Sequence, residues 1–192
     1  SNATAGGTNL STSTNFIGIS LALGTTTATS VQGNVIKNIR STLNGFTASY
    51  GIYLTSGTAN IGTVTGNTVG SSNSSERIEV NGDSYGMSIS SSSPGVVTLS
   101  NNAVRNMTMT STSFPTGEYR YGISVSGSGA HTITNNTVDQ FTNNSTTDAS
   151  YNTQTIGLNI TATGVETITG NTISNIGCTN TTAPTANNNK VW

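Results

Sequence analysis

The sequence is poor in charge, cysteine and histidine. Charged residues make up 7% of its 192 residues, and six basic against seven acidic side chains leave a formal net charge of -1. A nucleic-acid-binding surface needs clustered Lys and Arg to neutralise phosphates, so nucleic acid is not an expected partner. One cysteine, Cys178, excludes an internal disulfide, and together with one histidine, His131, it excludes thiolate and histidine-rich metal centres. No apolar run approaches the roughly 18 residues of a membrane-spanning helix, so no membrane-spanning segment is expected.

Small polar residues dominate instead. Ser, Thr and Asn account for 89 of the 192 residues, and hydrophobic residues for 32%. This composition is common in secreted and cell-surface proteins of bacteria, so an extracellular location is expected. The opening Ser1-Asn2-Ala3 matches the scar of a removed expression tag. Residues 1–3 are therefore left out of the reasoning about the fold.

Two short motifs recur in step along the chain. In the first, a glycine follows an aromatic or apolar residue and precedes alternating apolar residues. Its glycines recur at intervals of 33, 35, 36 and 35 residues: Gly18, Gly51, Gly86, Gly122 and Gly157. The second motif contains asparagines at intervals of 33, 35, 34 and 35 residues: Asn34, Asn67, Asn102, Asn136 and Asn171. The matching periods indicate one structural unit that is repeated five times.

Within each repeat, apolar residues alternate with polar ones, which is typical of β-strands. A first strand follows each glycine, a second strand precedes each asparagine, and a third strand follows it. The residues expected to point inward from the second strands are Val31, Val64, Leu99, Ile133 and Ile168. In the third strands the second repeat is the weakest, with Val69 followed by Ser72. The pattern predicts an all-β solenoid of about five coils, which begin near residues 16, 50, 85, 121 and 156.

This arrangement resembles the right-handed parallel β-helix of the pectin-lyase-like superfamily. The resemblance covers residues 16–192 and implies three short strands in each coil. In that family a ladder of stacked asparagines often fills the tight turn between the second and third strands, which is where the asparagines of the second motif fall. Asn tolerates left-handed backbone conformations and bonds neighbouring backbone, so we expect these asparagines to form a structural ladder. Parallel crossovers also strongly prefer the right hand.

The residues outside the three strands fall before each first strand. Long loops are therefore expected at 40–49, 72–84, 108–120, 142–155 and 177–190, and residues 4–15 are expected to be a remnant of a preceding coil or loop. One further period places Trp192 where a sixth coil would begin. Because no capping helix is apparent, we expect the end coils to be covered by their own tails or to stack end to end on another molecule.

Polysaccharide lyases and glycoside hydrolases of the pectin-lyase-like superfamily use the face of the first strands. Their chemistry needs several carboxylates close together, to bind calcium or to act as acid and base. The expected outward positions of the first strands are Ser20, Tyr53, Ser88, Ser124 and Asn159. None of these side chains is acidic or basic, so no catalytic residue, cofactor or metal is expected in this segment.

Most charged residues and several tyrosines fall in the expected loops. Aromatic rings with carboxylates and guanidinium groups can bind sugars, so the candidate ligand-binding residues are Tyr53, Glu76, Arg77, Glu79, Asp83, Glu118, Tyr119, Arg120, Asp148 and Tyr151. The alternative is that loops are simply where solvated residues lie. Calcium binding by Glu76, Glu79 and Asp83 is a further alternative, although their spacing matches no calcium-loop motif.

Two lone residues and one strand pattern complete the analysis. His131 is expected to point outward as a surface side chain, and Cys178 is expected to be structural. Threonines flank the inward residue of several second strands, as in residues 63–65 and 132–134, which resembles the ice-binding faces of some β-solenoid antifreeze proteins. The alternative is that β-branched Thr simply suits an exposed strand.

Together these observations predict a non-catalytic β-helix segment of a larger secreted or cell-surface bacterial protein. Its expected role is a structural stalk or adhesin-like module, with binding of polysaccharide or of a host or cell-surface glycan as its candidate activity. The alternative is a fragment of a pectin-lyase-like polysaccharide lyase or glycoside hydrolase whose catalytic coils lie outside this segment.

Overall fold

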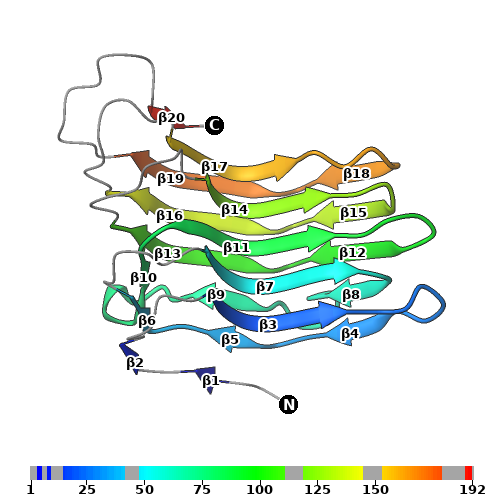
Figure 1. The fold of residues 1–192 in the computed structure, drawn as a ribbon, viewed down its shortest axis with the longest axis horizontal. Helices are drawn as coiled ribbons and strands as arrows, with labels where there is room; N and C mark the ends of the chain where they lie inside the picture. Colours follow the sequence, from blue (N-terminus) through cyan, green and yellow to red (C-terminus); the bar gives the residue numbers. More distant parts are fainter. Residues whose placement is uncertain are drawn as a thin grey trace.

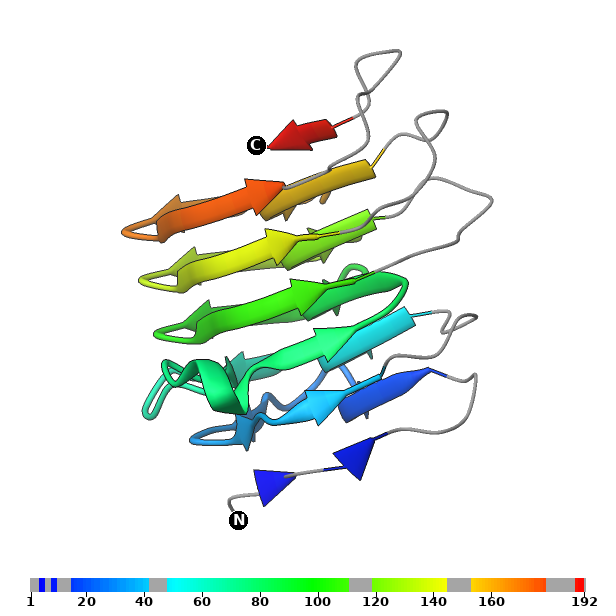
Figure 2. The same cartoon turned by 90° about the vertical axis from the view of Figure 1, so that its left-hand side faces the viewer.

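The computed structural model describes residues 4–5, 8–9, 15–41, 48–110, 119–144, 153–178 and 189–191. These residues form an all-β parallel solenoid of about four turns, in which three sheets run along the stack of coils (Figures 1 and 2). The predicted fold class is confirmed, with slightly fewer turns than the five coils expected. Of the described residues, only Ser74–Glu76 (η1) form a helix, a single 3-10 turn that is far too short to cross a membrane.

Each sheet collects equivalent strands of successive coils. The first sheet contains β3 (Phe16–Ala22), β7 (Ala48–Ser56), β11 (Asp83–Ser90), β14 (Tyr119–Ser126), β17 (Thr153–Ile160) and β20 (Asn189–Val191). The second sheet contains β4 (Thr29–Val31), β8 (Ala59–Ile61), β12 (Val96–Ser100), β15 (Ala130–Thr134) and β18 (Glu166–Thr169). The third sheet contains β1 (Thr4–Ala5), β2 (Thr8–Asn9), β5 (Val35–Ile36), β6 (Ile39–Arg40), β9 (Thr68–Gly70), β10 (Ile78–Val80), β13 (Ala103–Met109), β16 (Thr137–Asn143) and β19 (Thr172–Cys178). The strands pair in parallel, so equivalent residues of neighbouring coils lie side by side.

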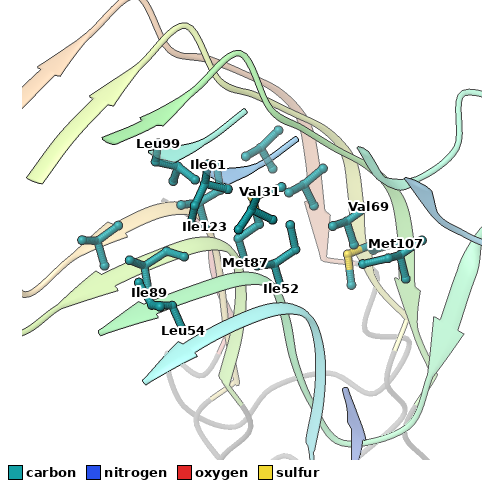
Figure 3. Close-up of a cluster of buried hydrophobic side chains, with 14 of the residues drawn as sticks. Val31, Ile52, Leu54, Ile61, Val69, Met87, Ile89, Leu99, Met107 and Ile123 are labelled. Atoms are coloured by element: carbon teal, nitrogen blue, oxygen red, sulfur yellow. The ribbon is translucent and has the colours of Figure 1, made fainter. Parts of the chain in front are cut away.

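Alternate side chains of all three sheets point into the solenoid and form one core. The buried side chains include Ile52, Leu54, Met87, Ile89 and Ile123 from the first sheet, Val31, Ile61 and Leu99 from the second, and Val69 and Met107 from the third (Figure 3). Burying such a side chain contributes about 1.5–3 kcal/mol. Because every layer fills the same narrow interior, a chain with 32% hydrophobic residues can form a continuous core.

The glycines of the first motif let successive coils approach closely. A Cβ on Gly18 would lie 2.7 Å from the carbonyl oxygen of Gly51, and one on Gly122 would lie 2.6 Å from that of Gly157. A Cβ on Gly122 would also collide with the core side chain of Val138 in the third strand of its own coil. The glycine column therefore recurs because any side chain at this position would separate the layers.

The asparagines of the second motif form a hydrogen-bonded ladder between the second and third strands. The backbone N and Nδ2 of Asn67 donate to Oδ1 of Asn102 at 3.0 and 2.9 Å. The backbone N and Nδ2 of Asn102 in turn donate to Oδ1 of Asn136, both at 3.0 Å. The same pair of bonds is repeated at each step from Asn34 to Asn171. The ladder thereby satisfies backbone groups of the turn in each coil.

Left-handed backbone conformations fall on the residues around the ladder and not on the ladder itself. The residue directly before a ladder asparagine is left-handed in four coils: Gly33 (φ 62°), Asn101 (φ 59°), Asn135 (φ 57°) and Gly170 (φ 66°). A second left-handed column lies between two inward residues of the third strands: Asn38 (φ 57°), Asn106 (φ 52°), Gln140 (φ 55°) and Asn175 (φ 50°). This additional residue explains why the inward residues of the third strands lie three positions apart and not two.

The second strand of the second coil departs from the pattern read from the sequence. Ile61 pairs with Leu99 and is fully buried, whereas Val64 is 85% exposed. The prediction that Val64 points inward is therefore wrong. The connection before β8 is shorter than in the other coils, and the turn after it is longer. The two differences compensate, so the coil keeps the usual repeat length although its second strand begins earlier. Thr63 and Thr65 consequently do not flank an inward residue, and the expected threonine pattern is interrupted here.

The third strand of the same coil contains an excursion. The chain leaves the third sheet after β9 and returns as β10, where the buried Ile78 pairs with Met107 of the next coil. The loop expected at 72–84 is therefore partly wrong, because Ile78, and not Ser72, fills the second core position of this strand. Strands β13, β14, β16, β17 and β19 also extend into ranges expected to be loops.

At each end of the solenoid a further strand continues the stack. β20 lies against the start of β17, and β1 and β2 lie against β5 and β6. Ile168 and Ile173 occupy inward positions of the last complete coil, yet they are 44% and 45% exposed because no described residue covers them. Trp192, expected to begin a sixth coil, lies outside the described residues.

Candidate functional site

The predicted binding residues fall into three groups, because the expected loops are not one continuous surface. The first group lies on the third-sheet side, the second lies inside the core, and the third lies on the outer face of the first sheet. Three of the predicted residues, Glu118, Asp148 and Tyr151, lie outside the described residues.

The first group is a network of ion pairs. Glu76 accepts hydrogen bonds from Nζ of Lys37 at 2.8 Å, and Oε2 of Glu79 accepts from Arg40 at 2.9 Å and from Arg77 at 2.6 Å. The hydrogen bond from Lys37 lowers the pKa of Glu76 below its usual value, and a second bond from a serine hydroxyl lowers it further. Both carboxylates are thus paired with cations within the network. Ion pairs that stay accessible to solvent contribute little to stability.

The three carboxylates of the expected calcium site belong to different parts of the fold. Glu79 lies on β10 in the third sheet, Glu76 ends the 3-10 turn before it, and Asp83 begins β11 in the first sheet. Within the part of the chain that the structure describes, no three His, Cys, Asp or Glu side chains are grouped closely enough to hold a metal ion.

Arg120 lies in the interior and not in an exposed loop. Its side chain is fully buried on the inner face of β14, in register with Ser84 and Thr155. Burial raises the pKa of the Cys178 thiol, and the charge of Arg120 acts in the opposite direction, which places the guanidinium near that thiol. Arg120 is therefore part of a polar end of the core, and the prediction that it presents charge to a ligand is wrong.

His131 also points inward, contrary to the expectation that it is a surface side chain. Its imidazole is 1% exposed, and Nδ1 lies 2.8 Å from Oε1 of Glu166 in the next coil. His131 pairs with Val97 in the preceding coil and shares its face with Ile133, two residues further along the strand. The His131–Glu166 pair thus occupies a core position that is apolar in the preceding coil.

The third group forms a continuous row of tyrosine rings on the first sheet. The ring centroids of Tyr53 and Tyr50 lie 4.4 Å apart, those of Tyr50 and Tyr85 lie 4.8 Å apart, and both pairs are stacked. Tyr121 follows Tyr85 at 5.4 Å with a tilted ring, and Tyr119 stacks on Tyr121 at 6.0 Å. These five tyrosines, from three successive coils, are named the tyrosine row below.

Asp83 lies beside the tyrosine row. Its Oδ1 accepts a hydrogen bond from the backbone N of Tyr119 at 2.8 Å. Burial raises the pKa of Tyr50, Tyr85 and Tyr121 above the usual tyrosine value, and the negative charge of Asp83 raises each of them further. The hydroxyls of these three tyrosines therefore stay protonated at physiological pH and can donate hydrogen bonds.

The hydroxyls of the tyrosine row have no partner within the described part of the protein, whose hydrogen bonds include none to a tyrosine hydroxyl. Tyr119 is 46% exposed. Tyr50, Tyr85 and Tyr121 lie in one register, which Ile17 and Ile156 extend by one coil on either side. The result is a stripe that runs along the solenoid axis across five layers, about 19 Å at the usual strand spacing.

Sequence reasoning found this site in part. Tyr53, Asp83 and Tyr119 were among the predicted ligand-binding residues, and they belong to the tyrosine row or lie beside it. For Tyr50, Tyr85 and Tyr121 the sequence pattern predicts a place in the repeat and no binding role. The signal that could have found them is the recurrence of Tyr directly before the glycine in three successive coils.

The chain matches no protein-family model, no curated protein and no solved structure at a significant level. The parallel solenoid is the part of the predicted resemblance that the structure shows. Membership of the pectin-lyase-like superfamily stays a prediction.

Proposed function

We propose that this chain is a non-catalytic β-helix segment of a larger secreted or cell-surface protein of the pectin-lyase-like superfamily. It acts as a stalk or adhesin-like module, and the tyrosine row binds polysaccharide. The observation that carries the proposal is the row itself, which combines aromatic rings with hydroxyls that have no partner in the described residues.

The chemistry of the row suits a carbohydrate. Sugars combine apolar ring faces with many hydroxyls, and buried or half-buried tyrosines offer an apolar body with a polar end. The terminal rings of the stack, Tyr53 and Tyr119, have one face that no other ring of the row covers. A glycan that lies along the stripe can contact these rings while its hydroxyls bond the phenol groups. Small polar residues beside Tyr53 in register, Ser20 and Ser88, leave room on the same face.

The sequence offers a variant that separates binding from folding. Isoleucine already occupies the register of Tyr85 in two other coils, as Ile17 and Ile156. Tyr85→Ile is therefore expected to preserve the solenoid while it removes one ring and one hydroxyl from the row. The loss of one hydrogen bond and one aromatic contact is worth about 1–2 kcal/mol.

The test is a polysaccharide array followed by titration calorimetry with the strongest ligand. Tyr85→Ile should weaken binding about tenfold, while Thr132→Ala, an outward substitution on the second sheet, should leave it unchanged. Urea unfolding of each variant checks that the fold is retained. Absence of binding across the array, or equal affinity of Tyr85→Ile and the parent, would contradict the proposal. Release of reducing or unsaturated ends from uronic-acid polymers would instead support the alternative of a lyase or hydrolase fragment.

A further inference from the structure

The two ends of the solenoid are uneven, and the sheet that protrudes differs between them. At the N-terminal end the third sheet ends in β1 and β2, one layer beyond β3 and β4, which end the first and second sheets. At the C-terminal end the first sheet ends in β20, one layer beyond β18 and β19, which end the second and third sheets. Figure 1 shows β20 at one end of the stack and β1 and β2 at the other. Each end therefore has a step that is one strand deep.

The strands at these steps have open edges. Among the residues that the structure describes, no strand pairs with the outer edge of β1, β2, β3 or β4 at one end, or of β18, β19 or β20 at the other. Such edges present backbone N–H and C=O groups with which another strand can pair. The C-terminal end also exposes an apolar core position, because Ile173 continues the inward column of Val138 and yet is 45% exposed. A partner strand there satisfies backbone groups and covers apolar surface at once.

We infer that the two ends bind each other, so that copies of this chain associate head to tail. β20 of one copy pairs with β3 of the next copy, and β1 and β2 of that next copy cover β19 of the first. The steps fit because each end protrudes in a sheet in which the other end is recessed. Every strand pairing in the described sheets is parallel, so a copy displaced along the solenoid axis presents its strands in the direction that this pairing needs. Only the second sheet lacks a described strand in the layer that the two copies share.

The register of the first sheet within one copy fixes the register expected between two copies. Val191 pairs with Thr155, and the same column runs through successive strands to Phe16 in β3. The contact therefore sets Val191 of one copy against Phe16 of the next, and Lys190 against Asn15. Strands that pair in this way lie about 4.8 Å apart.

The third sheet supplies the other half of the contact. The column of Ile173 runs back through Val138 to Ile36, which pairs with Ala5 of β1. Between copies, the same register places β1 of the next copy, at Ala5, over Ile173. The apolar position that is open at the C-terminal end is therefore covered in the contact.

The contact joins two different surfaces and does not close on itself. A heterologous contact of this kind is repeated from copy to copy and produces an open filament. The filament is a longer rod of the same cross-section. Its formation does not depend on the glycan binding proposed above, because the ends of the solenoid and the tyrosine row are different surfaces.

Sedimentation velocity and small-angle X-ray scattering of the full chain test the association. Over about a hundredfold range of concentration, the mean particle length should grow while the cross-section stays constant. Ile173→Lys places a charge under the next copy and should weaken association by about tenfold or more. Val64→Lys is the matched control, because this valine of the second coil is 85% exposed and lies away from both ends, and it should leave association unchanged. Urea unfolding of both variants checks that the fold is retained.

Pairs of introduced cysteines test the register. In a Cys178→Ser background, Asn15→Cys combined with Lys190→Cys should form a ladder of disulfide-linked multimers on mild oxidation. Within one copy these two positions lie at opposite ends of the first sheet, about 24 Å apart at the usual strand spacing, which is too far for a disulfide. Ser20→Cys combined with Lys190→Cys is the matched control, because it moves one cysteine about 16 Å along β3 and should link few copies.

A chain that stays monomeric over the whole concentration range overturns the inference, and so does association that stops at a dimer, because a closed pair uses another contact. Equal association of Ile173→Lys and the parent, or equal linking by the two cysteine pairs, overturns it as well. If Ile173→Lys does not fold, the cysteine pairs decide, because they leave Ile173 in place. None of these outcomes bears on glycan binding, which the polysaccharide array tests separately.

Discussion

The asparagine ladder predicts that the same substitution, Asn to Ala, lowers the free energy of unfolding more in the middle of the ladder than at its end. Asn102 lies in the middle of the ladder. Its Oδ1 accepts from the backbone N and Nδ2 of Asn67, and its Nδ2 donates to Oδ1 of Asn136 and to the carbonyl oxygens of Ile61 and Ser100. Asn34 lies at the end of the ladder, and within the described part of the chain its side chain donates one bond, from Nδ2 to Oδ1 of Asn67 at 2.9 Å.

The two substitutions to alanine therefore differ in what they leave unpaired. Asn102→Ala leaves the buried backbone N–H of Asn67 without an acceptor, which costs about 1–3 kcal/mol, and the lost donations add about 1 kcal/mol. The expected loss of unfolding free energy is about 2–4 kcal/mol. Asn34→Ala leaves no described backbone N–H without its acceptor, so the expected loss is that of one ordinary hydrogen bond, about 0.5–1.5 kcal/mol.

The measurement is urea unfolding followed by circular dichroism, with free energies compared at constant m-value. Asn159→Ala is the matched control, because this outward asparagine of the first sheet makes one side-chain bond to the residues that the structure describes, to Oγ of Ser124 at 3.2 Å. It should change the free energy of unfolding by no more than about 0.5 kcal/mol. If Asn102→Ala and Asn34→Ala cost the same, or if Asn102→Ala costs no more than Asn159→Ala, the ladder does not stabilise the turns as argued.

The remaining predictions concern the glycine column, the hydrogen-bonded pair of His131 and Glu166, and the tyrosines. Gly86→Ala should cost about 2–3 kcal/mol because its Cβ would collide with a core valine and with the glycine carbonyl of the next coil, whereas Gly24→Ala has open space around its Cβ and should be nearly neutral; equal urea midpoints would contradict this. Glu166→Ala should cost about 1–3 kcal/mol by leaving His131 buried without its partner, and replacing both residues by valine should recover most of that loss; a double variant no more stable than Glu166→Ala would be the contrary result. Burial raises the pKa of Tyr85 in the folded chain, so its contribution to stability is fully present below a pH of about 10 and is lost as the pH rises further. Ultraviolet titration should show part of the tyrosine absorbance change only on alkaline unfolding, and complete titration in the folded chain would refute the assignment.

The fold could be predicted because its main contacts join equivalent residues of successive coils. A glycine that touches the glycine of the next coil, and an asparagine that bonds the next asparagine, must recur with the period of the structure. Two independent motifs with the same period therefore identify a solenoid without any knowledge of its turns. The connections could not be predicted in the same way, because a short connection and a long turn compensate within one coil. The exchange of Ile61 for Val64 is the result of such a compensation.

Two polar side chains, His131 and Arg120, lie in the core although the sequence analysis expects both outside it. His131 lies two residues before the inward Ile133, so strand alternation alone places it inside. Arg120 is different, because it lies three residues before the inward Ile123 and strict alternation would place it outside. Gly122 and Ile123 both face the core, which shifts the alternation by one residue and turns Arg120 inward. A surface position is the expectation for both because charged and polar residues usually lie there. The sequence did not reveal that polar groups accompany these two side chains: the buried Ser84 lies in register with Arg120, and the partly buried Glu166 contacts His131.

The position directly before the repeated glycine, where three residues of the tyrosine row lie, is less restricted by the fold than the glycine and ladder positions. At the glycine and ladder positions, one residue type serves in nearly every coil because the contacts between layers admit no other. Directly before the glycine, the fold accepts both isoleucine, as in Ile17 and Ile156, and tyrosine, as in Tyr50, Tyr85 and Tyr121. Packing between layers therefore does not demand tyrosine at this position. Yet tyrosines occupy it in three consecutive coils, with hydroxyls that no described residue engages. This combination of a permissive position, a contiguous run and hydroxyls without a partner in the described residues separates the tyrosine row from the structural columns, and it is why we assign binding to this face.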